Sequence, residues 1–469
     1  MYKLKTNPWL HQWKALDYLM VRDHAALFTD MGSGKTKVMI DLIVNRDFKF
    51  VLIVGTKKSC DVWEKEFEIH SELKNCVFNL CNHSTPDKLS IMKEKLRLAS
   101  ISDVPAVFIN NYESVWREPL KTFLYKQKFD CIICDESHKI KAPSTKVSIC
   151  MSALGNRAKC RYILTGTPTP ESPIDIYSQY KFLDPAIFGT NFSRFKDRYE
   201  NVDIRKSMYA GYTVLDKKQP YKNLDELEKK IYSCAFYTES EVELPKVTHV
   251  YREQELSPKA QEIYKELDRE GVYEDESGIT ETTNILVKHT RLQQLLSGYL
   301  FVEDEDFTVQ ELVEKDHSKQ EMLEDLLDSI PKWEKVVVFA KYRKDFDNIK
   351  ETCKKLKRTY GEVSGQCDDY NRWKQGKVNC LAVQYSSGAE SISLVEARYC
   401  IYYSHTFSYG QYRQSLKRTH RPGQTRPITY YHIISTVKGK QTVDEKIRKA
   451  LSLKQSLSEY ILTNENNVY

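Results

Sequence analysis

The stretch His24-Ala-Ala-Leu-Phe-Thr-Asp-Met-Gly-Ser-Gly-Lys-Thr-Lys-Val-Met-Ile-Asp41 joins a short apolar run, a glycine turn and an amphipathic helix. Gly32 and Gly34 carry no Cβ, so with Ser33 they can form a tight turn whose N–H groups point at phosphate oxygens beside the positive end of the helix. The strict P-loop pattern has glycine where this chain has Thr29. The stretch predicts a nucleotide-phosphate site, with an ordinary strand–turn–helix connection as the alternative.

Three side chains near this turn specify the ligand more closely. Lys35 is expected to reach the β- and γ-phosphates, and the Thr36 hydroxyl to ligate Mg²⁺. Gln12 lies in a segment whose apolar spacing predicts a helix from Trp9 onward. Glutamine can pair with the N6 and N7 edge of adenine and so favours ATP, although a lone glutamine on a helix is commonly only solvated. ATP and Mg²⁺ are therefore the expected cofactors.

Two adjacent carboxylates, Asp135 and Glu136, follow an apolar run of strand length. Such a pair is costly at the end of a buried strand unless a cation or a water network uses it. Asp135 is expected to hold Mg²⁺ through water, and Glu136 to orient and deprotonate the attacking water. A later run, Tyr162–Pro168, predicts another strand whose tip carries hydroxyl groups, suited to hydrogen-bond the acidic pair and to sense the γ-phosphate.

Apolar runs alternate with helical stretches, which predicts an α/β fold with a parallel sheet flanked by helices. Phe50–Val54 and Ala106–Ile109 are two such runs, and each ends in polar residues. Ligands bind at the carboxyl ends of parallel strands, so these polar ends are expected on one rim, where they could hold a phosphate backbone. Ordinary loop chemistry explains each of them nearly as well. The candidate nucleic-acid contacts are Lys57, Lys58, Asn110, Asn111 and, in the second half of the chain, Ser386.

Composition narrows the class of protein. The 469 residues, 41% hydrophobic and 29% charged, suffice for two or three domains with cores of their own. No apolar run is long enough for a membrane span, no secretion signal opens the chain, and twelve cysteines are scattered without a framework. We therefore expect a cytoplasmic protein, or a nuclear one in a eukaryote. The net charge of +6 requires any nucleic acid to be held by a local groove.

The order of these motifs resembles that of superfamily two helicases, and most closely the Swi/Snf-like ATPases. The segments that carry the resemblance in the first half are Leu10–Gln12, Asp30–Thr36, Asp135–His138 and Leu164–Pro168. Further similar segments are Val242–Lys246, Arg291–Gly298, Lys335–Ala340 and Gln414–Gln424. Because the motifs occupy nearly the whole length, the chain looks like the compact bacterial or phage members rather than the nucleosome remodellers.

The resemblance implies two RecA-like lobes in tandem, residues 1–243 and 244–469. Helical protrusions are expected near 175–240 and 257–300, and a closing helix that braces the lobes near 443–464. By the same resemblance ATP binds in the cleft between the lobes, DNA lies across the rim, and Arg418 and Arg421 reach the γ-phosphate as arginine fingers. The residues expected to couple the nucleotide to the DNA are His138, Thr165, Thr167, Gly388 and Gln414.

The function expected from these features is a DNA-stimulated ATPase that translocates, as a monomer, on double-stranded DNA through backbone contacts. Two alternatives stay open. One is a strand-separating helicase. The other is an ATP-gated DNA-binding or recruitment module that does not translocate, which is suggested by Ser387–Leu394, where Gly388 is the only glycine in a segment that is glycine-rich in the family.

Overall fold

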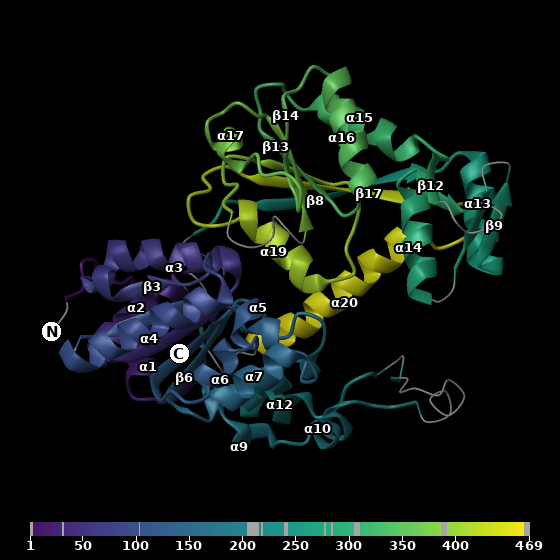
Figure 1. The fold of residues 1–469 in the computed structure, drawn as a ribbon. Coiled ribbons are helices and arrows are strands. Elements are labelled where there is room, and N and C mark those ends of the chain that lie inside the picture. The colour runs from purple at the N-terminus through teal and green to yellow at the C-terminus, as the bar shows by residue number, and fades with distance from the viewer. Residues whose placement is uncertain are drawn as a thin grey trace. The chain divides into compact units, whose positions relative to one another are not determined.

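The computed structural model describes residues 3–463 except 31, 103, 204–214, 217–218, 239–242, 276–277, 283–284, 304–309 and 386–391. The chain forms two compact units (Figure 1). The first comprises Met1–Glu243 with Lys454–Tyr469, and the second comprises Leu244–Leu453.

The first unit is built on a seven-stranded sheet in the order β3-β4-β2-β5-β6-β1-β7, with every pair parallel. Its central strands are mostly apolar because helices cover both faces of the sheet, as parallel sheets require. In β2, Leu52 and Val54 enter one hydrophobic cluster, whereas Val51 and Ile53 enter another on the opposite face. The strands are β1 (His24–Thr29), β2 (Phe50–Gly55), β3 (Val77–Asn79), β4 (Ala106–Asn111), β5 (Phe129–Asp135), β6 (Ala158–Thr165) and β7 (Ala235–Thr238).

The helices of this unit alternate with its strands. They are α1 (Leu10–Met20), α2 (Lys35–Asn45), α3 (Lys57–His70), α4 (Thr85–Ser102), α5 (Tyr112–Val115), α6 (Leu120–Leu124), α7 (Lys146–Gly155), α8 (Ile176–Leu183), α9 (Pro185–Phe188), α10 (Phe192–Tyr199) and α12 (Leu224–Tyr232), with short 3-10 turns at Leu73–Cys76, Ser137–Ile140 and Pro173–Asp175. Cys60 of α3 and Cys81 after β3 form a disulfide, a pairing that the sequence analysis did not predict.

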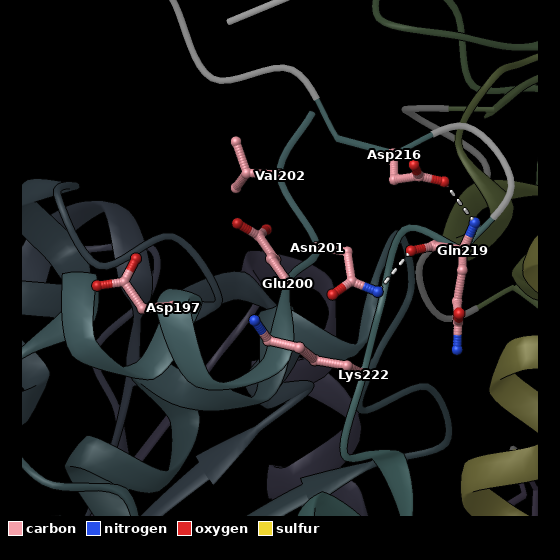
Figure 2. Close-up of a pocket in the computed structure, with 7 residues that line it drawn as sticks. All are labelled: Asp197, Glu200, Asn201, Val202, Asp216, Gln219 and Lys222. Carbon is pink, nitrogen blue, oxygen red and sulfur yellow. Dashed lines mark hydrogen bonds between the residues drawn. The ribbon is translucent and has the colours of Figure 1, made fainter. Parts of the chain in front are cut away.

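A pocket of about 610 Å³ lies near α10, in the segment where a protrusion was predicted (Figure 2). Asn201 donates to the Gln219 carbonyl, and the Gln219 N–H donates to Asp216. None of the candidate site residues lines this pocket. Its lining residues are Asp197, Glu200, Asn201, Val202, Asp216, Gln219 and Lys222.

The second unit contains a six-stranded parallel sheet in the order β14-β15-β13-β16-β17-β8. Its strands are β8 (Val247–Glu255), β13 (Val336–Ala340), β14 (Tyr360–Val363), β15 (Cys380–Gln384), β16 (Tyr399–Tyr402) and β17 (Ile428–Thr436). The helices are α13 (Pro258–Glu270), α14 (Ile285–Leu296), α15 (Ser318–Ser329), α16 (Arg343–Lys355), α17 (Tyr370–Lys374), α19 (Tyr409–Thr419) and the first part of α20 (Val443–Thr463). From Lys454 onward α20 belongs to the first unit, so the second unit ends earlier than the predicted lobe 244–469. The predicted fold class, two parallel-sheet lobes with helices, is confirmed.

An antiparallel sheet in the order β12-β11-β10-β9 also belongs to the second unit. The sequence analysis expected only helices near 257–300, where α13 and α14 are in fact accompanied by strands. These strands are β9 (Val272–Asp275), β10 (Gly278–Glu281), β11 (Tyr299–Glu303) and β12 (Gln310–Glu314).

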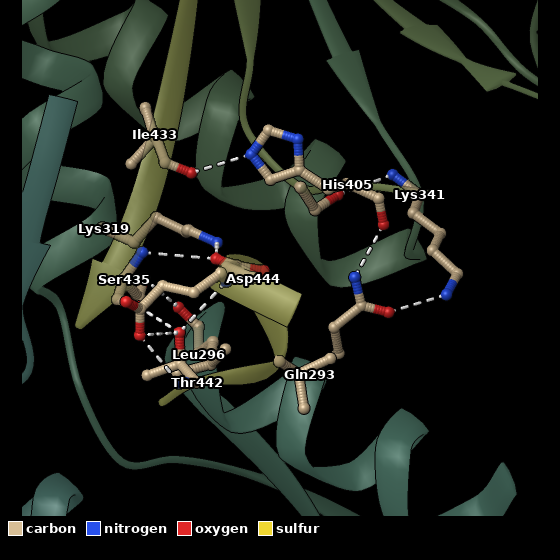
Figure 3. A network of polar contacts seen from close by, with 12 residues as sticks. Gln293, Leu296, Lys319, Lys341, His405, Ile433, Ser435, Thr442 and Asp444 are labelled. Atoms are coloured by element: carbon tan, nitrogen blue, oxygen red, sulfur yellow. Dashed lines mark hydrogen bonds and ion pairs between the residues drawn. The ribbon is translucent and has the colours of Figure 1, made fainter. Parts of the chain in front are cut away.

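A buried polar network fastens the helices of the second unit to its parallel sheet (Figure 3). Lys319 of α15 pairs with Asp444 of α20 at 2.8 Å, and Asp444 also accepts from the Ser435 N–H of β17. Nearby, Lys341 donates to Gln293 of α14 at 2.7 Å, and Gln293 donates to the His405 carbonyl at 2.6 Å. These contacts fix the segments that follow β13 and β16.

Among the described residues, no helix has the length and apolar character to cross a membrane.

Candidate active site

The turn between β1 and α2 has the backbone shape that the sequence predicts for phosphate binding. Gly32 and Gly34 adopt φ angles of 84° and 82°, in the left-handed region that favours glycine. A Cβ at Gly34 would lie 2.2 Å from Gln12 Nε2, so the close approach of α1 also requires glycine there. The N-cap residue of α2 is Gly34, which has no side chain to cap the helix, and an uncapped helix N-terminus is suited to an anion.

Gln12 is buried against this turn. Its Nε2 donates to the Ser33 carbonyl at 3.0 Å, and its Oε1 accepts from the Trp9 N–H at 2.9 Å. His11 Nε2 lies 2.9 Å from the same Ser33 oxygen. The structure thus brings Gln12 to the predicted nucleotide site with its amide bonded to protein atoms, and adenine recognition would require these bonds to be exchanged.

Lys35 folds over the turn. Its Nζ donates to the Thr29 and Asp30 carbonyls at 2.9 and 3.0 Å, while Ser33 Oγ lies 2.7 Å from Thr29 Oγ1. An anionic phosphate is a stronger acceptor for an ammonium than a neutral carbonyl is. Lys35 can therefore turn toward a phosphate that enters the turn, with Thr36 following it in the first turn of α2.

Asp135 ends β5 and is held on several sides. Its Oδ2 accepts from Trp63 Nε1 at 2.9 Å, its Oδ1 accepts from the Glu136 N–H at 3.0 Å, and its carbonyl accepts from Tyr112 OH at 2.7 Å. Burial, and then the charge of Glu136, raise the pKa of Asp135 above its ordinary value. Sequence reasoning missed Trp63 and Tyr112.

Glu136 has φ and ψ angles of 51° and 52°, an uncommon conformation for a residue with a Cβ. Such strain is typical of functional sites. Its Oε2 lies 3.3 Å from His138 Nδ1, and that nitrogen lies 3.4 Å from Thr165 Oγ1 at the end of β6. Thr165 Oγ1 also accepts from the Thr167 N–H at 3.0 Å. The structure therefore brings together Glu136 and the three coupling residues predicted in the first unit.

The residues present fit a magnesium nucleotide. A hydroxyl and a buried carboxylate, Thr36 and Asp135, are oxygen donors of the kind that Mg²⁺ prefers. Burial raises the pKa of Asp135, and a divalent cation beside this carboxylate would stabilise its ionised form. Bound with ATP, Mg²⁺ would neutralise phosphate charge, while Lys35 binds the phosphates and Glu136 orients the water.

The predicted rim residues separate into two groups. Lys57 and Lys58 begin α3, with Lys57 exposed and Lys58 half-exposed. Asn110 and Asn111, at the end of β4, are instead buried, and their Oδ1 atoms accept from Lys88 Nζ at 2.9 and 2.7 Å. Burial lowers the pKa of Lys88 to about 8, and Lys88 itself is only 3% exposed. The two asparagines thus satisfy a buried lysine beneath the rim, a contact that sequence reasoning missed.

The two predicted arginine fingers differ in accessibility. Arg418, on α19, is 2% exposed, and its Nη1 donates to the Ile392 carbonyl at 3.3 Å. Arg421 follows α19 and is half-buried, and burial lowers its pKa. Gln414 is buried on α19. The predicted DNA contact Ser386 and the predicted coupling residue Gly388 lie outside the described residues.

Comparison with known proteins identifies the family. Residues 11–299 match the SNF2-related domain. The chain belongs to the SNF2-related family. Residues 318–423 match the helicase conserved C-terminal domain, so the protein has the domain make-up of a helicase-like ATPase. The resemblance to Swi/Snf-like ATPases, drawn from the motifs, is confirmed.

The SNF2-related chain is also similar to individual proteins along most of its length. An uncharacterized ATP-dependent helicase of Mycoplasma pneumoniae is 24% identical over 465 residues, which cover 94% of this chain and 40% of that protein. Putative protein p41 of Acyrthosiphon pisum secondary endosymbiont phage 1 is 21% identical, and the match covers 97% of this chain and 98% of that protein. The DNA repair and recombination protein RDH54 of Saccharomyces cerevisiae is 24% identical, and the match covers 93% of this chain and 51% of that protein.

The chain spans 40% of the length of the Mycoplasma pneumoniae relative and 33% of a second one, the uncharacterized ATP-dependent helicase MG018 of Mycoplasma genitalium. Among solved structures, the SWI2/SNF2 ATPase core of Sulfolobus solfataricus in complex with dsDNA is 20% identical, with a TM-score of 0.44, and the match covers 99% of this chain and 95% of that one.

Proposed function

We propose that this protein is a DNA-stimulated, magnesium-dependent ATPase that moves along double-stranded DNA, with Met1–Glu243 and Leu244–Leu453 as the main parts of the two lobes of the motor. The observation that carries the proposal is the arrangement at the carboxyl edge of the first sheet. There the glycine turn leads into α2, which begins at Lys35, and Asp135 ends β5 with Glu136 directly after it. Carboxyl edges of parallel strands are where ligands bind in such sheets.

Two observations support DNA as the partner. Lys57 and Lys58 begin α3 at the same edge, directly after β2, whose neighbours are β4 and β5. Lysines placed on such a rim can hold backbone phosphates without reading bases. The yeast relative, in addition, is named as a DNA repair and recombination protein. We therefore assign the rim to the DNA backbone.

Steady-state ATP hydrolysis at low salt tests this function directly. Rates would be compared without nucleic acid and with saturating duplex DNA, single-stranded DNA or RNA, with Lys35→Ala as the blank. We expect duplex DNA to stimulate hydrolysis most strongly. In a second assay, we expect the protein to displace a triplex-forming strand from duplex DNA. Stimulation by single strands alone would favour the strand-separating helicase, and no stimulation by any nucleic acid would favour the ATP-gated module.

Replacing Lys57 and Lys58 together by alanine is expected to weaken binding to all DNA sequences alike. The plot of log K against log salt has a negative slope, and each lost phosphate contact should make it shallower by about 1, so the slope of the double variant should be shallower by about 1–2. Equilibrium binding to unrelated duplexes at several salt concentrations measures both effects.

The matched control is Lys126→Ala with Lys128→Ala. It removes the same charge from two exposed lysines that precede β5, at the amino edge of the sheet. An equal salt slope in the two double variants would mean that the DNA backbone is not held by Lys57 and Lys58.

A further inference from the structure

Helix α3 contributes residues to both the proposed DNA contact and the candidate ATP site. Its first two residues are Lys57 and Lys58, and its Trp63 bonds to Asp135. We propose that Trp63 is a positioning residue through which α3 makes ATP hydrolysis respond to DNA, by fixing Asp135 while the start of the helix contacts the DNA backbone. This inference rests on the proposed DNA-stimulated ATPase and adds the residue that links its two ligands.

The start of α3 lies unusually close to the end of β5. A Cβ on Gly55, the last residue of β2, would lie 2.4 Å from Ser59 Oγ and 3.6 Å from Asp135 Cβ. Glycine at this position therefore leaves room for Ser59 of α3 beside Asp135. The Thr56 side chain caps the helix by accepting from the Ser59 N–H at 3.3 Å, which fixes where the first turn begins.

Ser59 and Trp63 are four residues apart and so lie on one face of α3. Both are buried, Trp63 with 1% exposure. The hydroxyl of Ser59 donates to the Thr56 carbonyl at 3.1 Å, which holds the first turn of the helix beside Asp135. The indole of Trp63, on the same helix face, donates to the carboxyl group expected to bind the metal.

The indole of Trp63 is a donor only, so its partner must be an acceptor. It occupies Asp135 Oδ2, while the Glu136 N–H occupies Oδ1. A shift of the indole therefore moves a carboxyl group that is bonded directly to the backbone of the proposed catalytic base. This is a short physical link between the helix and the site of water activation.

Helix α3 can transmit such a shift because it is firmly packed. Trp63 and Phe67 belong to the hydrophobic cluster under the sheet, and Cys60 is tied to Cys81. Lys57 precedes Trp63 by less than two helical turns. A phosphate that pulls on Lys57 or Lys58 would therefore displace the indole with the helix, rather than unwind it.

The variant that tests the link is Trp63→Phe, which keeps an aromatic ring and removes the N–H. Its matched control is Trp373→Phe in the second unit, because Trp373 is 0% exposed and its indole donates to Glu396 at 3.4 Å. For both we would measure hydrolysis with and without duplex DNA, the DNA concentration for half-stimulation, and equilibrium binding of a fluorescent ATP analogue with and without Mg²⁺.

We expect Trp63→Phe to lower the maximal stimulation by DNA about tenfold, the effect of losing one hydrogen bond to a charged group. The DNA concentration for half-stimulation should stay unchanged, whereas Lys57→Ala with Lys58→Ala should raise it. The gain in nucleotide affinity on adding Mg²⁺ should also change in Trp63→Phe, because Asp135 is no longer fixed. Trp373→Phe should match the parent protein in all three measurements.

Unchanged stimulation in Trp63→Phe, or an equal fall in the rates with and without DNA, would overturn the inference, since the latter is what a purely structural role produces. If thermal unfolding shows that Trp63→Phe does not fold, Trp63→Met also lacks the N–H but fills the site with a flexible apolar side chain, and the same outcomes apply to it. Failure of the proposed function is distinct: the parent protein would then show no stimulation, while the Mg²⁺-dependent nucleotide binding would still report on Trp63.

Discussion

Replacing Glu136 by glutamine is expected to leave ATP binding intact and to lower ATP hydrolysis by about 10²–10⁴-fold, the usual contribution of a general base. Glutamine has the same size but cannot accept the proton of the attacking water. The strained backbone at Glu136, with a φ angle of 51°, aims this side chain toward His138 and the end of β6. Because the substitution preserves shape, it should preserve this geometry.

The measurement pairs turnover with binding of a fluorescent ATP analogue. Glu94→Gln is a suitable control, because Glu94 is an exposed carboxylate on α4 far along the chain from the candidate site. Parent-like turnover in Glu136→Gln would remove Glu136 from the role of base. Loss of nucleotide binding would show that the Glu136 carboxylate contributes to ATP binding itself, before the chemical step.

The features that could be predicted from the sequence are those fixed by local chemistry. The glycine turn requires left-handed backbone at Gly32 and Gly34, and both residues adopt it. The apolar runs before Gly55 and Asn110 predict buried strands, and both form in the parallel sheet. Each of these features depends on a few neighbouring residues, so spacing alone identifies it.

Contacts across the sheet could not be predicted in this way. Trp63 and Asp135 are 72 residues apart, and they meet because β2 pairs with β5, which places the helix after β2 beside the end of β5. The rotation of α3 then decides that Trp63, rather than a neighbour, faces the carboxylate. Neither strand order nor helix rotation can be read from the spacing of motifs.

Two predicted DNA contacts, Asn110 and Asn111, lie at the strand end as expected but are buried there. Asn110 and Asn111 are polar residues at a strand end, a position typical of ligand contacts, but Lys88 of α4 takes their oxygens. A buried ammonium requires acceptors, and the asparagines supply them. The sequence signal was a lysine on the apolar side of a helix, which can be recognised only once the orientation of that helix is known.

The antiparallel strands of the second unit were missed for a related reason. β9 and β10 have four residues each, and β10 pairs with β11 across the intervening helix α14. Strands this short carry little alternation of apolar and polar residues, and their partners are distant in the chain. The helices on either side, α13 and α14, have the stronger periodic pattern, which is why helices alone were predicted there.

Replacing Arg421 by alanine is expected to lower DNA-stimulated ATP hydrolysis by about 10³-fold or more, the range typical of an arginine finger. Both arginines of the final motif were predicted to act in this way. Arg421 is half-buried and follows the end of α19, whereas Arg418 is 2% exposed and donates to the Ile392 carbonyl. Only the more accessible guanidinium can reach a phosphate without the core of its unit being rearranged.

The two arginines should therefore fail in different ways. Arg421→Ala should keep its unfolding temperature and lose turnover, and Arg421→Lys should recover only part of the rate because lysine lacks the planar fork. Arg418→Ala should unfold at a lower temperature, since it removes a buried side chain that is bonded to the backbone of its own unit. The reverse pattern, lost turnover with parent-like stability in Arg418→Ala and normal turnover in Arg421→Ala, would make Arg418 the finger. It would also mean that the hydrogen bond from Arg418 to the Ile392 carbonyl must break during the catalytic cycle.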